Sequence, residues 1–369
     1  MEKPKPWIWQ NKNWPDFTYD EPDLSPLYHK LGQLEMAQKL LSDEDLAAFQ
    51  AKVLELEALY TSKLEGEVLD QVLLKKSVYS HLNFSTELSS NTAQTDGLVS
   101  LLMDSKHSLE PLSPTRLFAW HQTLFSSNKE GSYPILAGQY RDEKQGEVQV
   151  VSGTWENEII HYQAPSAHTL ELEMNRLLLW LSTQNRIDPI IKSAIVHIWF
   201  LLIHPFSDGN RRLARCLSEH TLALSPLIPN TLFTLAYEID ALKNEYYSLL
   251  DKVCSNESTD ITSWINWYLK IFSLSLDNAL ERVEEVKYKA LFWDKVQGLS
   301  LNARQRKLIS KMLKDEIAPK CLKTALYTEL FGCSKPTAAR DLIDLSHKKV
   351  LRSHGAGRGV YYQLYFEKH

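Results

Sequence analysis

The sequence lacks the features that would place the chain in a membrane or in an oxidising compartment. Of its 369 residues 44% are hydrophobic, but no stretch approaches the roughly 18–20 uninterrupted apolar residues that a membrane helix needs. The N-terminus has lysines but no apolar core and no small-residue cleavage site, so no secretory signal is predicted. The four cysteines are scattered without a CxxC pair. We expect a reduced, cytoplasmic protein of two or three domains, without zinc or a membrane span.

Charge is distributed unevenly along the chain. The net charge of −5 argues against a protein that coats nucleic acid along its whole length. Residues 301–369, however, hold 14 Lys and Arg against 6 Asp and Glu, which gives this segment +8 and leaves −13 for the first 300 residues. A basic tail on an acidic body predicts two parts with separate roles.

Helical periodicity dominates, so the predicted fold class is all-α. The first 30 residues are the exception, since five prolines and several tryptophans there favour an extended strap without a helix. A hairpin is predicted over 138–163, where glycines separate short runs of valine and isoleucine. Helices are predicted over 42–59, 67–79, 91–106, 113–125, 170–181, 188–203, 211–223, 241–253 and 261–292.

The basic tail has the element order of a winged helix. Helices are predicted over 303–314, 323–331 and 335–346, and a two-stranded wing over 350–364. This domain predicts DNA contact through a set of basic and polar residues: Lys335, Thr337, Arg340 and Arg358. Winged helices also serve protein contacts, so the alternatives are that the tail presents a target protein or joins two copies of the chain as a homodimer.

The run HPFSDGNRRLAR, residues 204–215, follows an almost wholly apolar helix. A buried helix that ends in so many polar groups indicates a binding site. Gly209, between Asp208 and Asn210, permits a sharp turn whose backbone N–H groups can converge on one anion. The next helix is expected to begin near Arg211 and to point the positive end of its dipole at the same place.

The same run holds the other groups that phosphate transfer needs. Arg212 and Arg215 share a helix face and suit two oxyanions of one polyphosphate. Asp208 can hold Mg²⁺ on a triphosphate, and His204 can take up a proton near neutral pH. Each residue alone is typical of a capped helix with a solvated face. Together, within twelve residues, they favour a phosphate-transfer site.

This run resembles the signature of the Fic family, HPFx[D/E]GNGRxxR. The matching positions are His204, Pro205, Phe206, Asp208, Gly209, Asn210, Arg212 and Arg215. The resemblance implies a helical Fic-type bundle and an enzyme, a protein adenylyltransferase. Such an enzyme moves AMP from ATP to a Ser, Thr or Tyr hydroxyl of a target protein.

The resemblance also implies roles for the residues. His204 would deprotonate the target hydroxyl, and Asp208 would hold Mg²⁺ on the phosphates of ATP. Arg212 and Arg215 would hold the leaving pyrophosphate. The implied nucleotide and phosphate ligands are Gly209, Asn210, Arg211, Arg212 and Arg215.

The chain departs from the signature at Arg211, where the family usually has glycine. The anion site uses backbone N–H groups, so a side chain fits if φ at this position is negative. If φ were positive, the arginine would be strained by about 1 kcal/mol or more. The added charge could also change which nucleotide is preferred.

The segment TSKLEGE, residues 61–67, resembles the inhibitory motif [S/T]xxxE[G/N] of the same family. Thr61 and Glu65 lie one helical turn apart, and the resemblance implies that Glu65 reaches Arg215 and displaces the γ-phosphate. A carboxylate competes with a phosphate oxygen for one guanidinium. Taken alone, Glu65 is the last acid of a helix that Gly66 caps. The upstream position implies the self-inhibited class with an N-terminal inhibitory helix.

Three domains are therefore expected. Residues 1–95 form an N-terminal domain with the inhibitory helix at about 52–66, residues 96–295 the catalytic core, and residues 300–369 the winged helix. Within the core, the hairpin over 138–163 lies where the family carries a flap that binds the target chain by strand pairing. A structural hairpin unrelated to targets is the alternative.

Two other functions compete with AMP transfer. In some relatives the inhibitory glutamate, here Glu65, positions a water and the same site removes AMP. Alternatively, Arg211 spoils the phosphate site, and the chain is a DNA-binding regulator that only senses nucleotide.

Overall fold

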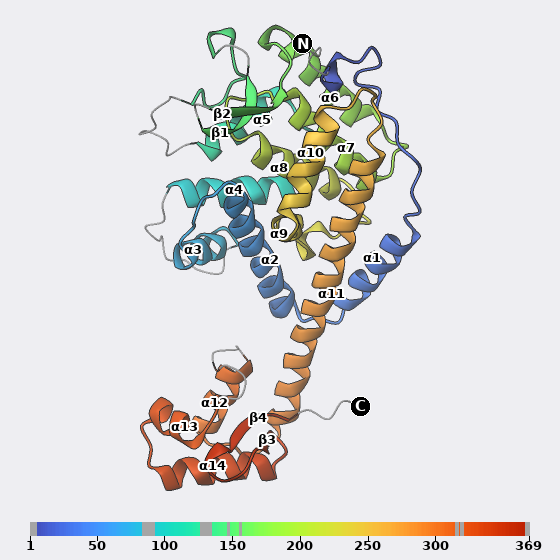
Figure 1. Ribbon diagram of the computed structural model, residues 1–369. Helices are drawn as coiled ribbons and strands as arrows, with labels where there is room; N and C mark the ends of the chain where they lie inside the picture. The colour runs from blue at the N-terminus through green and yellow to red at the C-terminus, as the bar shows by residue number, and fades with distance from the viewer. Residues whose placement is uncertain are drawn as a thin grey trace. The chain divides into compact units, whose positions relative to one another are not determined.

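The computed structural model describes residues 6–82, 93–125, 135–145, 148–154, 157–313, 317 and 321–365. The chain forms two compact units, residues 1–283 and 284–369, and the division falls within the helix α11 (Thr262–Gln297), which Figure 1 shows in orange. In the described ranges the regular secondary structure is helical apart from two antiparallel hairpins and one isolated bridge, which confirms the all-α prediction.

None of the helices in the described part of the chain is both long and apolar enough to cross a membrane.

The first unit holds the helices that position the candidate site, and most of them lie close to their predicted ranges. In chain order up to α11 they are α1 (Ser25–Gln38), α2 (Asp43–Leu64), α3 (Gln71–His81), α4 (Ala93–His107), α5 (Pro114–Leu124), α6 (Leu170–Thr183), α7 (Pro189–Ile203), α8 (Asn210–Ala223), α9 (Leu235–Ala241) and α10 (Lys243–Cys254). The predicted hairpin forms from β1 (Gln149–Thr154) and β2 (Asn157–Gln163), with a register shift between Val150 and Val151.

Helices α7 and α8 form the centre of this unit. From Ile190 onward α7 is buried except at Lys192, as expected for a helix that is apolar on all sides. One buried polar group of α7 is paired on both sides: His197 contacts the hydroxyls of Ser218 and Tyr246, each at 3.0 Å. Burial lowers the pKa of His197 to about 3, so its ring is neutral. The loop between α7 and α8 contains the predicted site.

The prediction that the first 30 residues contain no helix was wrong. Residues 11–24 are irregular, but α1 begins at Ser25, with Pro26 in its first turn. A proline costs little there because the first N–H groups of a helix have no partner within it. The preceding segment is fastened to the body: the indole N–H of Trp9 donates to the Gln163 carbonyl at 2.8 Å, and that of Trp14 to the Glu173 carboxylate at 2.9 Å.

The boundary between α2 and α3 also differs from the prediction. Helix α2 continues to Leu64 rather than ending at residue 59, and α3 begins at Gln71 rather than at residue 67. Gly66, in the left-handed region with φ 78°, ends α2. The Asp70 side chain caps α3 by accepting the Val72 N–H at 2.7 Å. Residues 65–70 therefore form a turn that faces the candidate site.

The second unit contains the remaining elements in the predicted order. These are the end of α11, then α12 (Ala303–Leu313), α13 (Thr324–Phe331), α14 (Lys335–His347), and the antiparallel pair β3 (Leu351–His354) and β4 (Tyr361–Leu364). Its core is formed by side chains such as Leu308, Tyr327 and Leu342. Helix α12 was predicted to reach residue 314, which lies outside the described residues. The winged-helix assignment stays a prediction.

A buried ion pair ties α4 to α8 in the first unit. Lys106 Nζ lies 2.7 Å from Glu219 Oε2, and the two side chains are 2% and 1% exposed. Lys106 also donates to the Asn230 carbonyl at 3.0 Å. Burial raises the pKa of Glu219, and the Lys106 charge opposes this rise. Removing one partner would leave the other as a buried, unpaired charge.

We predict that Lys106→Met lowers the free energy of unfolding by about 3–5 kcal/mol, the usual cost of breaking a buried pair. Lys52 is the control, because it is exposed and pairs with Glu55 on the surface of α2. Lys52→Met should change stability by about 1 kcal/mol or less. Urea unfolding followed by tryptophan fluorescence measures both. Equal stability of the two variants would contradict the account.

Candidate functional site

The site begins where α7 ends, at His204. This residue has φ 50° and ψ 59°, an uncommon conformation for a residue other than glycine. Its backbone N–H still donates to the Phe200 carbonyl at 3.0 Å, but Pro205 follows and the helix stops. The chain then turns through residues 205–209 and enters α8 at Asn210.

Arg141 fixes the backbone around His204. Its Nε donates to the His204 carbonyl at 2.8 Å, and its backbone N–H donates to the Pro205 carbonyl at 2.9 Å. A further guanidinium N–H donates to the Pro165 carbonyl. Arg141 is 3% exposed. It therefore joins three loop segments behind the histidine and is a positioning residue that the sequence did not reveal.

His204 is held in its neutral form. Burial, followed by the nearby charge of Arg141, lowers the pKa of His204 to about 4, although a hydrogen bond with the backbone of Leu201 opposes the shift. A neutral imidazole has one ring nitrogen that can accept a proton. The imidazole can thus act as a base across the neutral pH range.

His121 on α5 also contacts the turn between α7 and α8. The Gly138 N–H donates to its Nδ1 at 2.9 Å, so Nε2 carries the ring proton and faces the Asp208 carbonyl at 3.2 Å. The ring stacks on Phe206 with centroids 4.2 Å apart. Burial lowers the pKa of His121 to about 4, which keeps this donor–acceptor arrangement at neutral pH.

Gly209 and Asn210 give the turn its shape. Gly209 has φ 77°, and a Cβ there would lie 2.8 Å from the Phe125 ring, so both backbone and space require glycine. The buried Asn210 amide pairs with the backbone of Phe206, accepting its N–H at 3.0 Å and donating to its carbonyl at 2.8 Å. The Asn210 side chain thus shapes the loop, and its N–H is one of the free donors at the N-terminus of α8.

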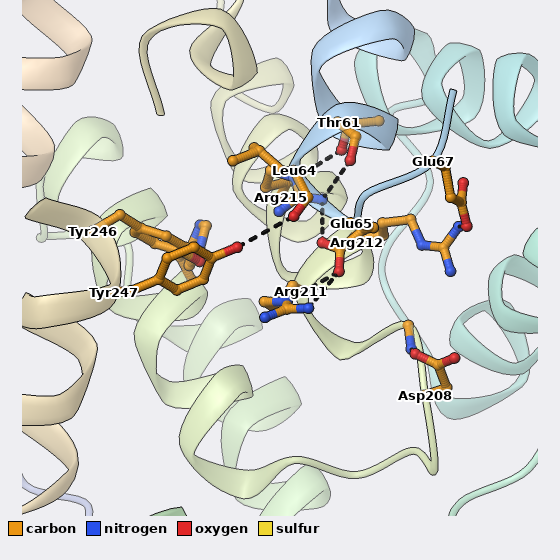
Figure 2. A network of polar contacts seen from close by, with 12 residues as sticks. Thr61, Leu64, Glu65, Glu67, Asp208, Arg211, Arg212, Arg215, Tyr246 and Tyr247 are labelled. Carbon is orange, nitrogen blue, oxygen red and sulfur yellow. Dashed lines mark hydrogen bonds and ion pairs between the residues drawn. The ribbon is translucent and has the colours of Figure 1, made fainter. Parts of the chain in front are cut away.

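Arg211 adopts helical backbone geometry. It lies within α8, and among the described residues other than glycine only His204 and Lys349 have positive φ. The strain considered for an arginine in the usual glycine position does not arise. The Arg211 side chain points toward the turn that follows α2 (Figure 2). Its guanidinium carbon lies 5.6 Å from the centroid of the Tyr247 ring.

The arginines of α8 are paired with the turn that follows α2. Glu65 lies between two of them, with Oε2 2.8 Å from Arg211 Nη2 and Oε1 2.9 Å from Arg215 Nη2 (Figure 2). Glu67 contacts Arg212 Nη1 at 2.7 Å. Each motif arginine therefore faces a carboxylate.

Thr61 completes the contact of α2 with Arg215. Arg215 Nε donates to the Thr61 hydroxyl at 2.7 Å, and Nη2 donates to the Thr61 carbonyl at 3.1 Å. Burial would raise the pKa of Glu65, but the charges and hydrogen bonds of Arg215 and Arg211 outweigh it and the pKa is lowered. Glu65 is therefore a carboxylate at neutral pH. Both predicted inhibitory residues, Thr61 and Glu65, contact Arg215, as predicted.

A cleft of about 380 Å³ opens beside these groups. Its walls come from the α7–α8 turn, the hairpin and α10. The residues of the predicted site that line it are Glu65, His204, Asp208, Gly209, Asn210 and Arg211. Tyr247 on α10 also lines it, and its hydroxyl donates to the Leu64 carbonyl at 3.2 Å. Arg212 and Arg215 are not among the lining residues, since the turn after α2 covers them.

A magnesium ion would have Asp208 as its protein ligand. The Asp208 side chain is exposed in the cleft, while the described residues contain no cluster of three or more metal-binding side chains. One carboxylate suits Mg²⁺, which takes its other ligands from phosphates and water. Two buried guanidinium nitrogens, Arg212 Nε and Arg215 Nη1, have no hydrogen-bond partner within the described ranges, so the donors also suit an anionic ligand.

Some of these groups were beyond sequence reasoning. No role was predicted for Arg141, Tyr247, Glu67 or His121, because none of them belongs to the two motifs. In the second unit the predicted DNA-binding residues fall on α14 and the wing. Lys335 and Arg340 are exposed on α14, Thr337 lies in its first turn, and Arg358 lies in the short turn Gly357–Gly359. Their role in DNA binding stays a prediction.

Comparison with known proteins identifies similar chains. Residues 111–222 match the Fic/DOC family, and residues 7–84 match a domain of unknown function (DUF4172). A probable protein adenylyltransferase of Aquifex aeolicus (strain VF5) is 33% identical over 67 residues, which is 18% of this chain and 21% of that relative. The chain therefore matches about a fifth of the length of this curated relative.

Solved structures extend the likeness. The crystal structure of a Fic family protein from Desulfovibrio desulfuricans G20 covers 95% of this chain and 98% of its own, with a TM-score of 0.57 and 16% identity. A Fic domain containing signaling protein from Bacteroides thetaiotaomicron VPI-5482 covers 70% and 96%, with a TM-score of 0.48 and 21% identity. The first of these confirms the predicted Fic-type fold, and at such identity it speaks of fold alone.

We predict that Gly209→Ala lowers the free energy of unfolding by about 1–3 kcal/mol. Alanine would be strained in the left-handed backbone conformation of this position, and its Cβ would overlap the Phe125 ring. The control is Gly32→Ala in α1, where an added Cβ meets nothing within 4 Å and φ is not positive. Alanine in a helix should raise stability there by about 0.5–1 kcal/mol. Thermal unfolding distinguishes them, and a Gly209→Ala protein as stable as the parent would contradict the geometry.

Proposed function

Because the chain carries a Fic/DOC family domain over residues 111–222, we propose that it is a protein adenylyltransferase. It transfers AMP from ATP to a Ser, Thr or Tyr hydroxyl of another protein. The observation that carries this proposal is the placement of a neutral imidazole, His204, beside free N–H groups at the start of α8, in one cleft with Arg211.

In the proposed reaction the target hydroxyl oxygen attacks the α-phosphorus. His204 takes the hydroxyl proton, a new P–O bond forms, and the bond between the α-phosphorus and the bridging oxygen breaks to release pyrophosphate. The N–H groups of Asn210 and Arg211 stabilise charge on the phosphates, and the Gly209 N–H, which donates to Asp208 Oδ1 at 2.6 Å in this structure, joins them once that bond is exchanged. Arg212 and Arg215 hold the leaving pyrophosphate, and Mg²⁺ on Asp208 would neutralise phosphate charge when bound.

The hairpin supports a role for a protein target. Gln149, Val150 and Val151 of β1 line the cleft that contains His204. A two-stranded hairpin has unpaired edges, so a target segment can add a strand and bring its hydroxyl to the cleft. The N-terminal strap supports the base of this hairpin, since Trp7 packs edge-on against Tyr162 with centroids 5.6 Å apart.

We further propose that Glu65 inhibits the transfer. Its two oxygens contact Arg215 and Arg211, so Glu65 competes with phosphate oxygens for these guanidinium groups. Arg211 makes this chain unlike the usual signature, because here the carboxylate is shared between two cations. The departure therefore strengthens the proposed inhibition and leaves the backbone of the phosphate site intact.

We predict that Glu65→Gly increases the transfer of radiolabel from α-labelled ATP to protein by at least about tenfold, because one charge-assisted contact corresponds to roughly that factor. The control is Glu44→Gln, at the start of the same helix and exposed. If Glu65 instead activates a water, the Glu65→Gly protein would lose the ability to remove AMP from a labelled protein and would not gain transfer. Tight ATP binding without any transfer would support the nucleotide-sensing alternative.

We also predict that His204→Ala, placed in the Glu65→Gly background, abolishes transfer and leaves ATP binding nearly intact. The pH profile of the parent background gives a second check. Because the pKa of His204 is lowered to about 4, the base is already neutral above about pH 5. Transfer should show no loss as pH falls from 8 to 6 and should decline only below about pH 5. An inflection near 6.5, or loss of ATP binding in the alanine variant, would contradict the assigned role.

A further inference from the structure

The turn that follows α2 presents two carboxylates from a rigid cap. With Gly66 in the left-handed conformation, the Gly66 N–H donates to the Lys63 carbonyl and the Glu67 N–H donates to the Ser62 carbonyl, each at 3.0 Å. This pair of bonds is the Schellman motif. It fixes the directions in which Glu65 and Glu67 leave the backbone, so the two side chains are held on the same short loop but point to different arginines.

Glu67 binds the arginine that Glu65 does not reach. Its Oε1 lies 2.7 Å from Arg212 Nη1, and the side chains of Glu67 and Arg212 are 29% and 7% exposed. Arg212 lies against the Phe125 ring, with its guanidinium carbon 5.3 Å from the ring centroid. A guanidinium so far removed from water is a strong anion site, because the surrounding low dielectric strengthens its charge.

The two carboxylates compensate two of the three positive charges of these arginines. Glu65 occupies Arg211 and Arg215, and Glu67 occupies Arg212. Yet two buried nitrogens, Arg212 Nε and Arg215 Nη1, have no hydrogen-bond partner in the described part of the chain. A polyphosphate would satisfy these donors better than two carboxylates do, because it offers more oxygens and more charge.

We infer that Glu67 is a second inhibitory residue, which competes with a phosphate oxygen for Arg212 independently of Glu65. The inference rests on the proposed function, since it concerns the same phosphate site. Loss of Glu65 alone would therefore leave Arg212 paired with a carboxylate and the site only partly open. Full opening requires both side chains to leave.

The test measures the binding of magnesium pyrophosphate by calorimetry, a probe that needs neither transfer nor a nucleotide. Glu67→Gln should tighten pyrophosphate binding by about tenfold in the full-length protein, and by a similar factor again in the Glu65→Gly background. A gain in both backgrounds is expected because Glu67 contacts Arg212, whereas Glu65 contacts Arg211 and Arg215. Arg212→Gln in the double variant should reverse the gain. The matched control is Glu55→Gln, which removes a paired carboxylate elsewhere on α2.

Several outcomes overturn the inference. If Glu67→Gln lowers the melting temperature but leaves pyrophosphate affinity unchanged in both backgrounds, the contact with Arg212 is only structural. The same conclusion follows if the double variant binds no more tightly than Glu65→Gly. Measurement of labelled AMP transfer in the same variants separates the two proposals. Tighter pyrophosphate binding without transfer supports the role of Glu67 and refutes the adenylyltransferase, whereas transfer with unchanged affinity does the reverse.

Discussion

The pairing of carboxylates from one turn with arginines from the start of one helix is the interaction on which the site depends. Three guanidinium groups at the N-terminal part of α8 would repel each other and attract any anion. The acids after α2 supply that negative charge from within the chain. In the proposed function this pairing means that the phosphate site is formed in advance but occupied, and that activity depends on exchanging one anion for another.

The surroundings of the turn explain why it keeps its shape during such an exchange. Arg141, His121 and Asn210 each hold loop backbone through uncharged carbonyl or amide groups, and none of them contacts Glu65. Loss of the carboxylate therefore changes the charge at the site without removing the bonds that form it. Thr61, Glu65 and Glu67 lie in the segment 7–84 that matches a domain of unknown function, outside the segment 111–222 that matches the Fic/DOC family.

The sequence allowed the helical fold and the central loop to be predicted, because both follow from local patterns. An apolar helix followed by a glycine turn and closely spaced arginines can be recognised within a short stretch of sequence. Contacts between distant segments do not, and so Arg141 and Tyr247 were missed. Helix α1 was missed for a different reason, since Pro26 breaks a helix interior but fits a first turn. The significance of Arg211 could not be foreseen, because its partner Glu65 lies 146 residues away in the chain.

The central claim is that the turn after His204 binds the phosphates of ATP once Glu65 is displaced. A crystal structure of the Glu65→Gly protein with ATP and magnesium tests it most directly. We expect the phosphates on the N–H groups of residues 209–211, with the α-phosphorus facing His204 and Arg215 in contact with the terminal phosphates. A turn without phosphate, or one filled by the Arg211 side chain, would contradict the account.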